Sequence, residues 1–247
     1  MKLTENVYVV GGGRFGFGIS GILDCHVYLI KDGSECALID AGLGLAGDFD
    51  KILDNIRSDG IDPKTIRKLI ATHYHADHIG AAQEARQRLE LEVLTSKLAA
   101  PVMREANEQA IALDVAKAAG FYPQDYHLSP CEVDRELAEG DVIEVGDLAL
   151  RVWETPGHCD GHLSFDFQGS DRKYLIGADL VFWGGKILLQ NIHDCRISAY
   201  GESVEKINRL EFDALLPGHL QISLWDGKEH VEKAAAAFRQ LGVPPNI

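Results

Sequence analysis

Hydrophobic and polar positions follow two repeating patterns along this chain. Short apolar runs, such as residues 7–10 and 68–72, have the length and the β-branched composition of buried strands. Between them lie amphipathic segments such as residues 48–58, in which apolar side chains recur at helical spacing. The alternation continues over 247 residues, which predicts one large α/β domain spanning residues 1–247.

The same patterns place the individual elements. Strands are expected at residues 7–10, 25–30, 36–40, 68–72, 91–94, 142–145, 148–153, 163–167, 173–176 and 214–216. Helices are expected at residues 48–58, 79–89, 201–210 and 228–241. A turn at residues 31–34 would join the second and third strands into a β-hairpin.

One segment interrupts the otherwise β-rich succession. Residues 97–119 are rich in alanine and helix-prone, and they end at Gly120. Residues 97–127 are therefore expected to form a helical insertion. It could be plain scaffold, or it could be a lid or dimerisation element over the active site, and the sequence leaves both roles open.

The composition excludes several classes of protein. The chain has 24 basic and 38 acidic residues, a net charge of −14, and such a surface repels nucleic-acid phosphates. No apolar run is long enough to span a bilayer, and the N-terminus lacks the apolar region of a signal peptide. The five cysteines form no C-x-x-C pair, which fits a reducing compartment. We therefore expect a cytoplasmic protein without a nucleic-acid or membrane partner.

A glycine-rich stretch at residues 11–18 contains the spacing G-x-G-x-x-G. A dinucleotide-binding fingerprint of this kind should open a helix, but a β-rich segment follows here. A flexible hairpin loop is the favoured interpretation, and such a loop could overhang the metal site.

Four candidate metal ligands lie within six residues, in the pattern His-x-His-x-Asp-His: His73, His75, Asp77 and His78. Imidazoles and a carboxylate form the nitrogen and oxygen ligand set that suits zinc or iron. His73 and His75 are two apart on an extended chain, so they should point the same way and share one metal. Asp77 and His78 should point elsewhere and could serve a second metal.

Three further ligand candidates follow expected strands. His158 comes after Thr-Pro-Gly, Asp179 after Ile-Gly-Ala, and His219 after Leu-Pro-Gly. A rigid strand fixes such a ligand, and the loop beyond it leaves room for substrate. Each would be weak evidence alone, but together with the histidine cluster they supply seven ligands, enough for two metals.

These motifs, in this order, resemble those of the metallo-β-lactamase superfamily, in particular its glyoxalase II-like and lactonase-like branch. The resemblance implies a four-layer αββα sandwich, with two mixed β-sheets flanked by helices. It also implies two zinc ions per chain, with Mn²⁺ or Fe²⁺ as alternatives. The implied ligands are His73, His75 and His158 for the first metal, Asp77, His78 and His219 for the second, and Asp179 as the bridge.

The implied reaction is hydrolysis by a hydroxide that two divalent metals share. A water between two such cations loses a proton near neutral pH, and the metals polarise the electrophile's oxygen. Asp77 is the candidate catalytic residue that would relay a proton to the leaving group. The favoured substrate is a small ester, thioester or lactone, and the resemblance also suggests a homodimer.

Other residues are candidates for supporting roles. Asp40 and His162 could orient ligand imidazoles. The candidates for substrate contacts are His26, Phe182, Lys186, His193 and Arg196.

Several rival functions stay open. A mononuclear iron persulfide dioxygenase would use the first-site ligands and Asp179, and a phosphodiesterase would attack phosphorus instead of carbon. A non-enzymatic metal sensor is a third alternative. Lactonases of this family carry a tyrosine where this chain has Phe182, which disfavours a lactone, and the glutathione-binding helices of glyoxalase II are reduced here.

Overall fold

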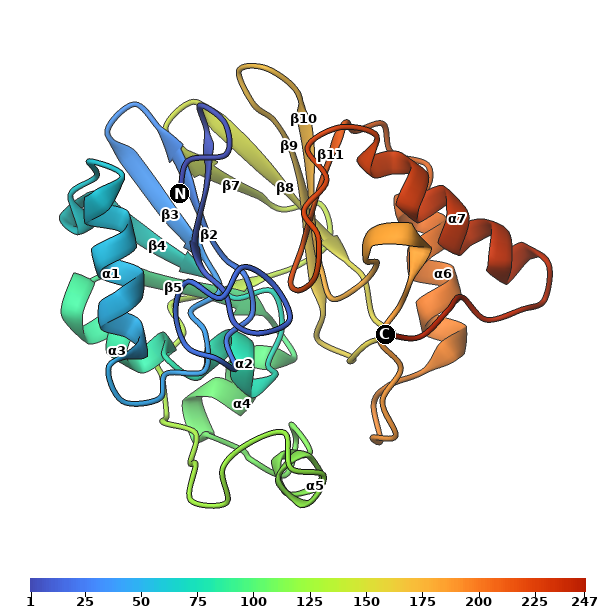
Figure 1. The fold of residues 1–247 in the computed structure, drawn as a ribbon, viewed down its shortest axis with the longest axis horizontal. Coiled ribbons are helices and arrows are strands. Elements are labelled where there is room, and N and C mark those ends of the chain that lie inside the picture. The colour runs from blue at the N-terminus through green and yellow to red at the C-terminus, as the bar shows by residue number, and fades with distance from the viewer. The chain divides into compact units, whose positions relative to one another are not determined.

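The computed structural model describes residues 1–247. They form two compact units. The first comprises Met1–Leu137 with Val145–Asp147, and the second comprises Ala138–Glu144 with Leu148–Ile247. Each unit is built on one β-sheet with helices beside it (Figure 1).

The first unit contains a six-stranded mixed sheet in the order β1-β2-β3-β4-β5-β6. The strands β1, β2 and β3 pair antiparallel, whereas β3 to β6 are parallel neighbours. Their side chains are mostly buried on both faces, as in Leu29 and Leu38, which accounts for the continuous apolar runs. The strands are β1 (Val7–Gly11), β2 (Val27–Asp32), β3 (Glu35–Ile39), β4 (Ile66–Ile70), β5 (Glu92–Ser96) and β6 (Arg135–Leu137).

Helices α1 (Asp48–Ser58) and α3 (Ala82–Leu89) lie along this sheet (Figure 1). The expected helix at residues 48–58 is confirmed with the same bounds. Its buried face includes Phe49, Ile52 and Ile56. A single-turn η1 (Pro63–Thr65) then leads into β4.

The second unit contains a five-stranded mixed sheet in the order β11-β10-β9-β8-β7. Helices α6 and α7 pack on each other, and their side chains Tyr200, Val204 and Val231 share one core with Leu175 and Leu215 of the sheet. The elements are β7 (Val142–Val145), β8 (Leu148–Glu154), β9 (Leu163–Gln168), β10 (Lys173–Ala178), η2 (Trp183–Gly185), α6 (Ile197–Ile207), β11 (Ala214–Pro217) and α7 (Gly227–Arg239).

The helix expected at residues 79–89 begins earlier and is broken. Helix α2 (Ala76–Ile79) ends at Gly80, and α3 starts at Ala82. A Cβ atom on Gly80 would lie 2.0 Å from the carbonyl oxygen of Leu43 and 2.4 Å from the hydroxyl of Tyr126. Close approach of these two groups requires glycine at the break.

The segment expected to be helical over residues 97–119 contains two short helices, α4 (Ala99–Glu105) and α5 (Leu113–Ala118). Ala106 and Ala112, at the ends that face the break, adopt left-handed φ angles of 48° and 50°. The side chain of Asn107 accepts a hydrogen bond from the N–H of Ala110, which favours a turn over a helix. The alanine content favours helix here, but the turn interrupts it.

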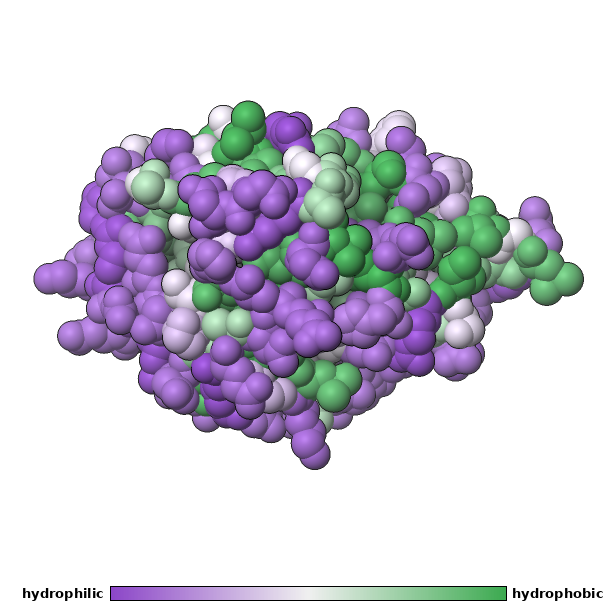
Figure 2. Space-filling view, turned by 90° about the horizontal axis from the view of Figure 1, so that it is seen from below, coloured by the Kyte–Doolittle hydropathy of each residue, from purple (hydrophilic) through white to green (hydrophobic).

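No helix combines the length and the apolar character needed to cross a membrane. On the face shown in Figure 2, hydrophobic residues are interspersed with hydrophilic ones.

Candidate metal centre

The His-x-His-x-Asp-His motif begins after β4 and runs into α2 in the first unit. The ring centroid of His73 lies 4.8 Å from that of His75 and 4.0 Å from that of His78. His75 is the N-terminal cap residue of α2, so the helix begins directly after it and brings His78 back towards His73. The three imidazoles thus form one cluster, although the strand pattern predicts that His78 points away from the other two.

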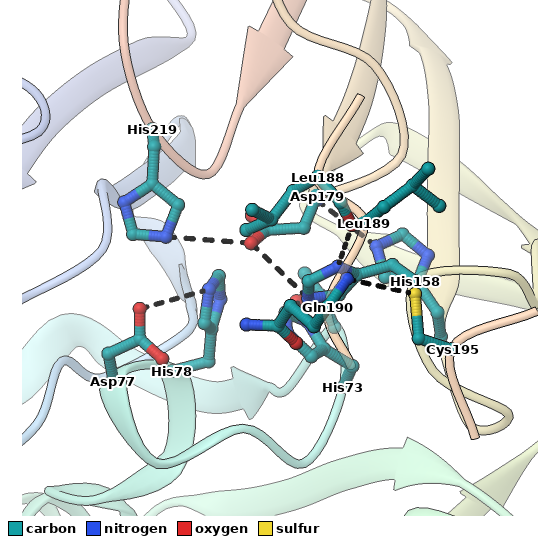
Figure 3. Close-up of polar contacts among 12 residues, drawn as sticks. His73, Asp77, His78, His158, Asp179, Leu188, Leu189, Gln190, Cys195 and His219 are labelled. Carbon is teal, nitrogen blue, oxygen red and sulfur yellow. Dashed lines mark hydrogen bonds and ion pairs between the residues drawn. The ribbon is translucent and has the colours of Figure 1, made fainter. Parts of the chain in front are cut away.

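Asp77 lies beside His78 on α2. Its Oδ2 atom is 3.7 Å from Nε2 of His78 (Figure 3), which is too long for a hydrogen bond. Two ligand atoms that are each about 2.1 Å from one tetrahedral cation lie roughly 3.4 Å apart. The observed spacing therefore suits two ligands of a common cation. The other oxygen, Oδ1, accepts a 2.7 Å hydrogen bond from the hydroxyl of Tyr122.

The buried carboxylate of Asp40 orients two of these imidazoles. His78 Nδ1 lies 2.8 Å from Asp40 Oδ2 and donates to it. Thr72 donates to the same carboxylate through its backbone N–H at 2.7 Å and its hydroxyl at 2.9 Å, and its hydroxyl oxygen lies 3.0 Å from Nδ1 of His73. Because both Nδ1 atoms act as donors, the Nε2 atoms of His73 and His78 carry the lone pairs that a metal needs.

The second unit brings together the other three candidate ligands. His158, Asp179 and His219 follow β8, β10 and β11 respectively, as expected. Asp179 Oδ2 lies 3.5 Å from His158 Nε2 and also 3.5 Å from His219 Nε2 (Figure 3). One carboxylate oxygen therefore stands between two imidazole nitrogens, at ligand-to-ligand spacing from each.

Backbone groups hold His158. Its Nδ1 donates to the carbonyl oxygen of Leu188 at 3.1 Å (Figure 3), which leaves the Nε2 lone pair directed towards Asp179. The preceding Gly157 has a φ of 145°, and a Cβ atom there would lie 2.4 Å from Cα of Tyr200. Only glycine allows the chain to pass Tyr200 this closely.

The backbone of Asp179 is held on both sides. Its N–H donates to Nε2 of His162 at 3.1 Å, and its carbonyl oxygen accepts from the hydroxyl of Tyr200 at 2.6 Å. Nδ1 of His162 lies 2.8 Å from the hydroxyl oxygen of Thr155, to which it donates because its Nε2 is an acceptor. His162 therefore holds the backbone of one candidate ligand, and its ring lies edge-on to the imidazole of another, His158, with the ring centroids 6.2 Å apart.

The donor atoms fit a divalent metal. Each unit offers imidazole Nε2 lone pairs next to a carboxylate oxygen, and the partners of Nδ1 set the required tautomers of His73, His78 and His158. This nitrogen and oxygen set is the one that zinc accepts, and Mn²⁺ or Fe²⁺ tolerate it too.

His26, a candidate for substrate contact, is buried beneath the glycine-rich loop. Its Nδ1 lies 3.4 Å from the hydroxyl of Tyr28, and its ring centroid is 5.6 Å from that of Phe17. A Cβ atom on Gly16 would come within 2.1 Å of the His26 imidazole. The structure therefore places His26 as a support for the loop at residues 11–18.

The remaining substrate candidates lie in the second unit. Phe182 is fully buried, with its ring centroid 6.4 Å from that of His219. Lys186 and His193 are exposed. The guanidinium of Arg196 pairs with the carboxylate of Asp160, so its charge is already partly satisfied. Of the four, Phe182 has a ring contact with a candidate ligand, His219.

Two residues at the centre were missed by sequence reasoning. Tyr122 contacts Asp77 from a turn in the insertion, and burial raises the pKa of its hydroxyl well above the usual value, which keeps it a hydrogen-bond donor. Cys25 donates its backbone N–H to the carbonyl of Asp77 at 3.3 Å. Burial raises the pKa of the Cys25 thiol far above its usual range, so the thiol is unreactive. No motif marks either residue in the sequence.

A model of the metallo-β-lactamase superfamily matches residues 20–219, which is most of the chain. The chain belongs to this superfamily. The matched range includes every candidate ligand of both units. The chain is accordingly a metallo-hydrolase of the metallo-β-lactamase superfamily, as the motifs indicate.

Curated relatives in the superfamily include two kinds of hydrolase. An acyl-coenzyme A thioesterase of Gallus gallus is 29% identical over 86% of this chain and 77% of the relative. A hydroxyacylglutathione hydrolase of Nitrobacter hamburgensis is 30% identical, but the match covers only 48% of this chain and 35% of that protein. The chain thus spans about a third of the length of this second relative.

The fold is shared with solved metallo-β-lactamases. A subclass B3 enzyme of Bradyrhizobium japonicum superposes with a TM-score of 0.73 at 21% identity, covering 98% of this chain and 91% of that one. The expected metallo-β-lactamase fold, with two mixed sheets flanked by helices, is therefore confirmed.

Proposed function

We propose that this metallo-hydrolase is a thioesterase that uses two divalent cations, zinc in the first instance, to hydrolyse a small acyl thioester. The observation that carries the proposal is the position of Asp179 Oδ2, 3.5 Å from two imidazole Nε2 atoms, as expected of an oxygen shared by two cations. The proposed ligands are His73, His75 and His158 for one cation, Asp77, His78 and His219 for the other, and Asp179 for both.

When bound, the two cations would supply a water that is deprotonated near neutral pH and a positive charge that polarises the thioester carbonyl. The chain's own residues orient the donors. Asp40 and the Leu188 carbonyl hold imidazole Nδ1 atoms, so that Nε2 faces the centre. His162 and Tyr200 hold the backbone of Asp179. Asp77 is proposed to take up the proton that the water loses and to pass it to the departing thiolate.

Thioesters are favoured because both kinds of curated relative are named for them: acyl-coenzyme A and hydroxyacylglutathione are each thioesters by their chemistry. Acyl-coenzyme A is the better candidate, since that match extends over most of both chains. An ester or a lactone is a weaker candidate, because neither curated match carries such a substrate in its name.

The loop between β1 and β2 supports an apolar acyl group. Phe15, Phe17 and Ile22 on this loop are 48%, 40% and 63% exposed, which is unusual for large apolar side chains on one loop. The hydrogen bond from Cys25 to Asp77 ties the end of the loop to the metal motif within the first unit. We infer that these side chains contact the acyl chain of the substrate.

The first test measures metal content and thioester hydrolysis on protein purified without added metal. Mass spectrometry should find about two zinc ions per chain, and release of free thiol should be faster for acyl-coenzyme A than for hydroxyacylglutathione. Asp179→Asn should lose at least one cation and lower kcat by about 100-fold or more, because a bridging oxygen loses its charge. Asp160→Asn is the matched control and should leave both unchanged, since Asp160 pairs with Arg196 at the surface.

Other outcomes would contradict the proposal. One iron per chain, with oxygen uptake on a persulfide and no thioester hydrolysis, would favour the dioxygenase. Equal metal loss in Asp179→Asn and Asp160→Asn would show that Asp179 does not bind both cations.

A further inference from the structure

We propose that Tyr122 is a positioning residue for Asp77 and, through it, for the second cation. The inference rests on the proposed function, because it takes Asp77 to be a ligand. It gives the insertion at residues 97–127 a part in building the metal centre, beyond the roles of scaffold and lid.

The contact divides the two oxygens of Asp77. The hydroxyl of Tyr122 donates to Oδ1 at 2.7 Å, and the other oxygen, Oδ2, is the one that lies 3.7 Å from Nε2 of His78. A carboxylate can bind a cation through either oxygen or through both. With Oδ1 engaged by an O–H donor, Oδ2 is the atom presented beside His78. The hydrogen bond therefore selects one binding mode of Asp77.

The turn that carries Tyr122 is itself held in place. Four residues later, the hydroxyl of Tyr126 donates to the carbonyl oxygen of Leu43 at 3.1 Å, next to the break at Gly80. The two tyrosine rings lie with centroids 6.1 Å apart. Both hydroxyls thus reach from the insertion to the region around α2, one to a candidate ligand and the other to the scaffold beside it.

Glu108 provides a second attachment at the end of this turn. Its Oε1 atom accepts from the backbone N–H of Leu128 at 3.0 Å and pairs with Nδ1 of His127 at 3.0 Å. Its Oε2 atom lies 3.8 Å from Nζ of Lys117 on α5. Because the turn is fixed at both ends, the tyrosine hydroxyl is held against Asp77 before any cation binds, which is how a hydrogen-bonded partner raises metal affinity.

The test compares Tyr122→Phe with Tyr126→Phe. Both variants lose one hydroxyl and keep the ring, but only the first loses a contact with a ligand. Cation binding is followed by titrating apo protein with Co²⁺ against a chelator and recording the ligand-field absorption of each step. We expect Tyr122→Phe to weaken the second step about tenfold and leave the first within about twofold. Tyr126→Phe should leave both steps within about twofold of the unaltered protein.

Steady-state kinetics with a thioester gives a second readout. Tyr122→Phe should lower kcat with little change in KM, because the substrate's own contacts remain. Equal weakening of both steps, or equal effects of the two variants, would mean a purely structural role and would overturn the inference. If the unaltered protein binds two cations and hydrolyses thioesters, either of these outcomes overturns only the role of Tyr122 and leaves the proposed function in place. If the unaltered protein binds none, the proposed function fails together with this inference.

Discussion

The two units hold their candidate ligands in different ways. In the first unit the ligands lie within six consecutive residues, and other side chains hold them. Thr72 contacts the imidazole of His73, Asp40 contacts that of His78, and Tyr122 contacts the carboxylate of Asp77. Most of the binding geometry there is local in sequence, and the fold adds only the partners.

In the second unit each ligand follows a different strand, and their contacts are largely through the backbone. The carbonyl of Leu188 holds His158, while His162 and Tyr200 hold the N–H and carbonyl of Asp179. Ligands that come from separate strands need a correct sheet register before they can meet. We therefore expect substitutions of the supporting residues in the first unit to lower cation affinity. Substitutions of the supporting residues in the second unit should mainly lower the free energy of unfolding.

The largest effect is expected for Asp40→Asn in the first unit. Asn tolerates the left-handed φ of 62° at this position, so the backbone can stay in place. The amide has one acceptor oxygen for three donors, so cation affinity should fall about 10- to 100-fold. The free energy of unfolding should fall by about 2–3 kcal/mol.

Chelator titration and urea unfolding measure the two quantities, and Asp50→Asn, on the exposed face of α1, is the control. A loss of stability in Asp40→Asn with unchanged cation affinity would break the comparison.

A smaller effect is expected for Tyr200→Phe in the second unit. The hydroxyl donates to the carbonyl of Asp179 at 2.6 Å and accepts from the N–H of Leu188 at 3.3 Å, so its removal takes a partner from one buried and one partly buried backbone group. We expect a loss of about 1–3 kcal/mol in the free energy of unfolding. The change in cation affinity should be smaller than that of Asp40→Asn.

Tyr174→Phe is the matched control for urea unfolding, because its hydroxyl donates to the carboxylate of the partly exposed Asp171. If Tyr200→Phe lowered cation affinity as much as Asp40→Asn does, support of a ligand through its backbone would matter as much as support through its side chain.

The smallest effect concerns His230, away from the ligands. Its Nδ1 accepts from the N–H of Gly184, its Nε2 lies 2.7 Å from the hydroxyl oxygen of Ser223, and burial lowers its pKa below 6.5. The unfolded chain therefore takes up a proton more readily than the folded one below about pH 6.5. Stability should be complete above that pH and should decline as the pH falls below it.

Urea unfolding between pH 5 and 8 tests this expectation. The decline should be weaker in His230→Gln than in the unaltered protein, and His193→Gln, at an exposed position, should behave like the unaltered protein. An unchanged profile in His230→Gln would assign the pH dependence to other groups.

Much of the fold could be read from local patterns. The helix at residues 48–58 was expected at its observed bounds, since one apolar stripe is enough to specify it. The short strand β6 was missed because three residues carry too little periodicity. The division of the insertion at Ala106 and Ala112 was also missed, because alanine favours helix and only the local turn opposes it.

The sequence by itself determined the ligand chemistry. His-x-His-x-Asp-His, with a histidine or an aspartate after each of three later strands, contains the right donor atoms in a recognisable order. Tertiary structure decided which atom of each donor is presented. Tyr122 lies 45 residues from Asp77, and Asp40 lies 38 residues from His78, so no local periodicity links either pair. Hydrogen bonds between such distant residues form only when strands and turns bring them within a few ångströms of each other. These bonds decide which tautomer His78 adopts and which oxygen of Asp77 is presented.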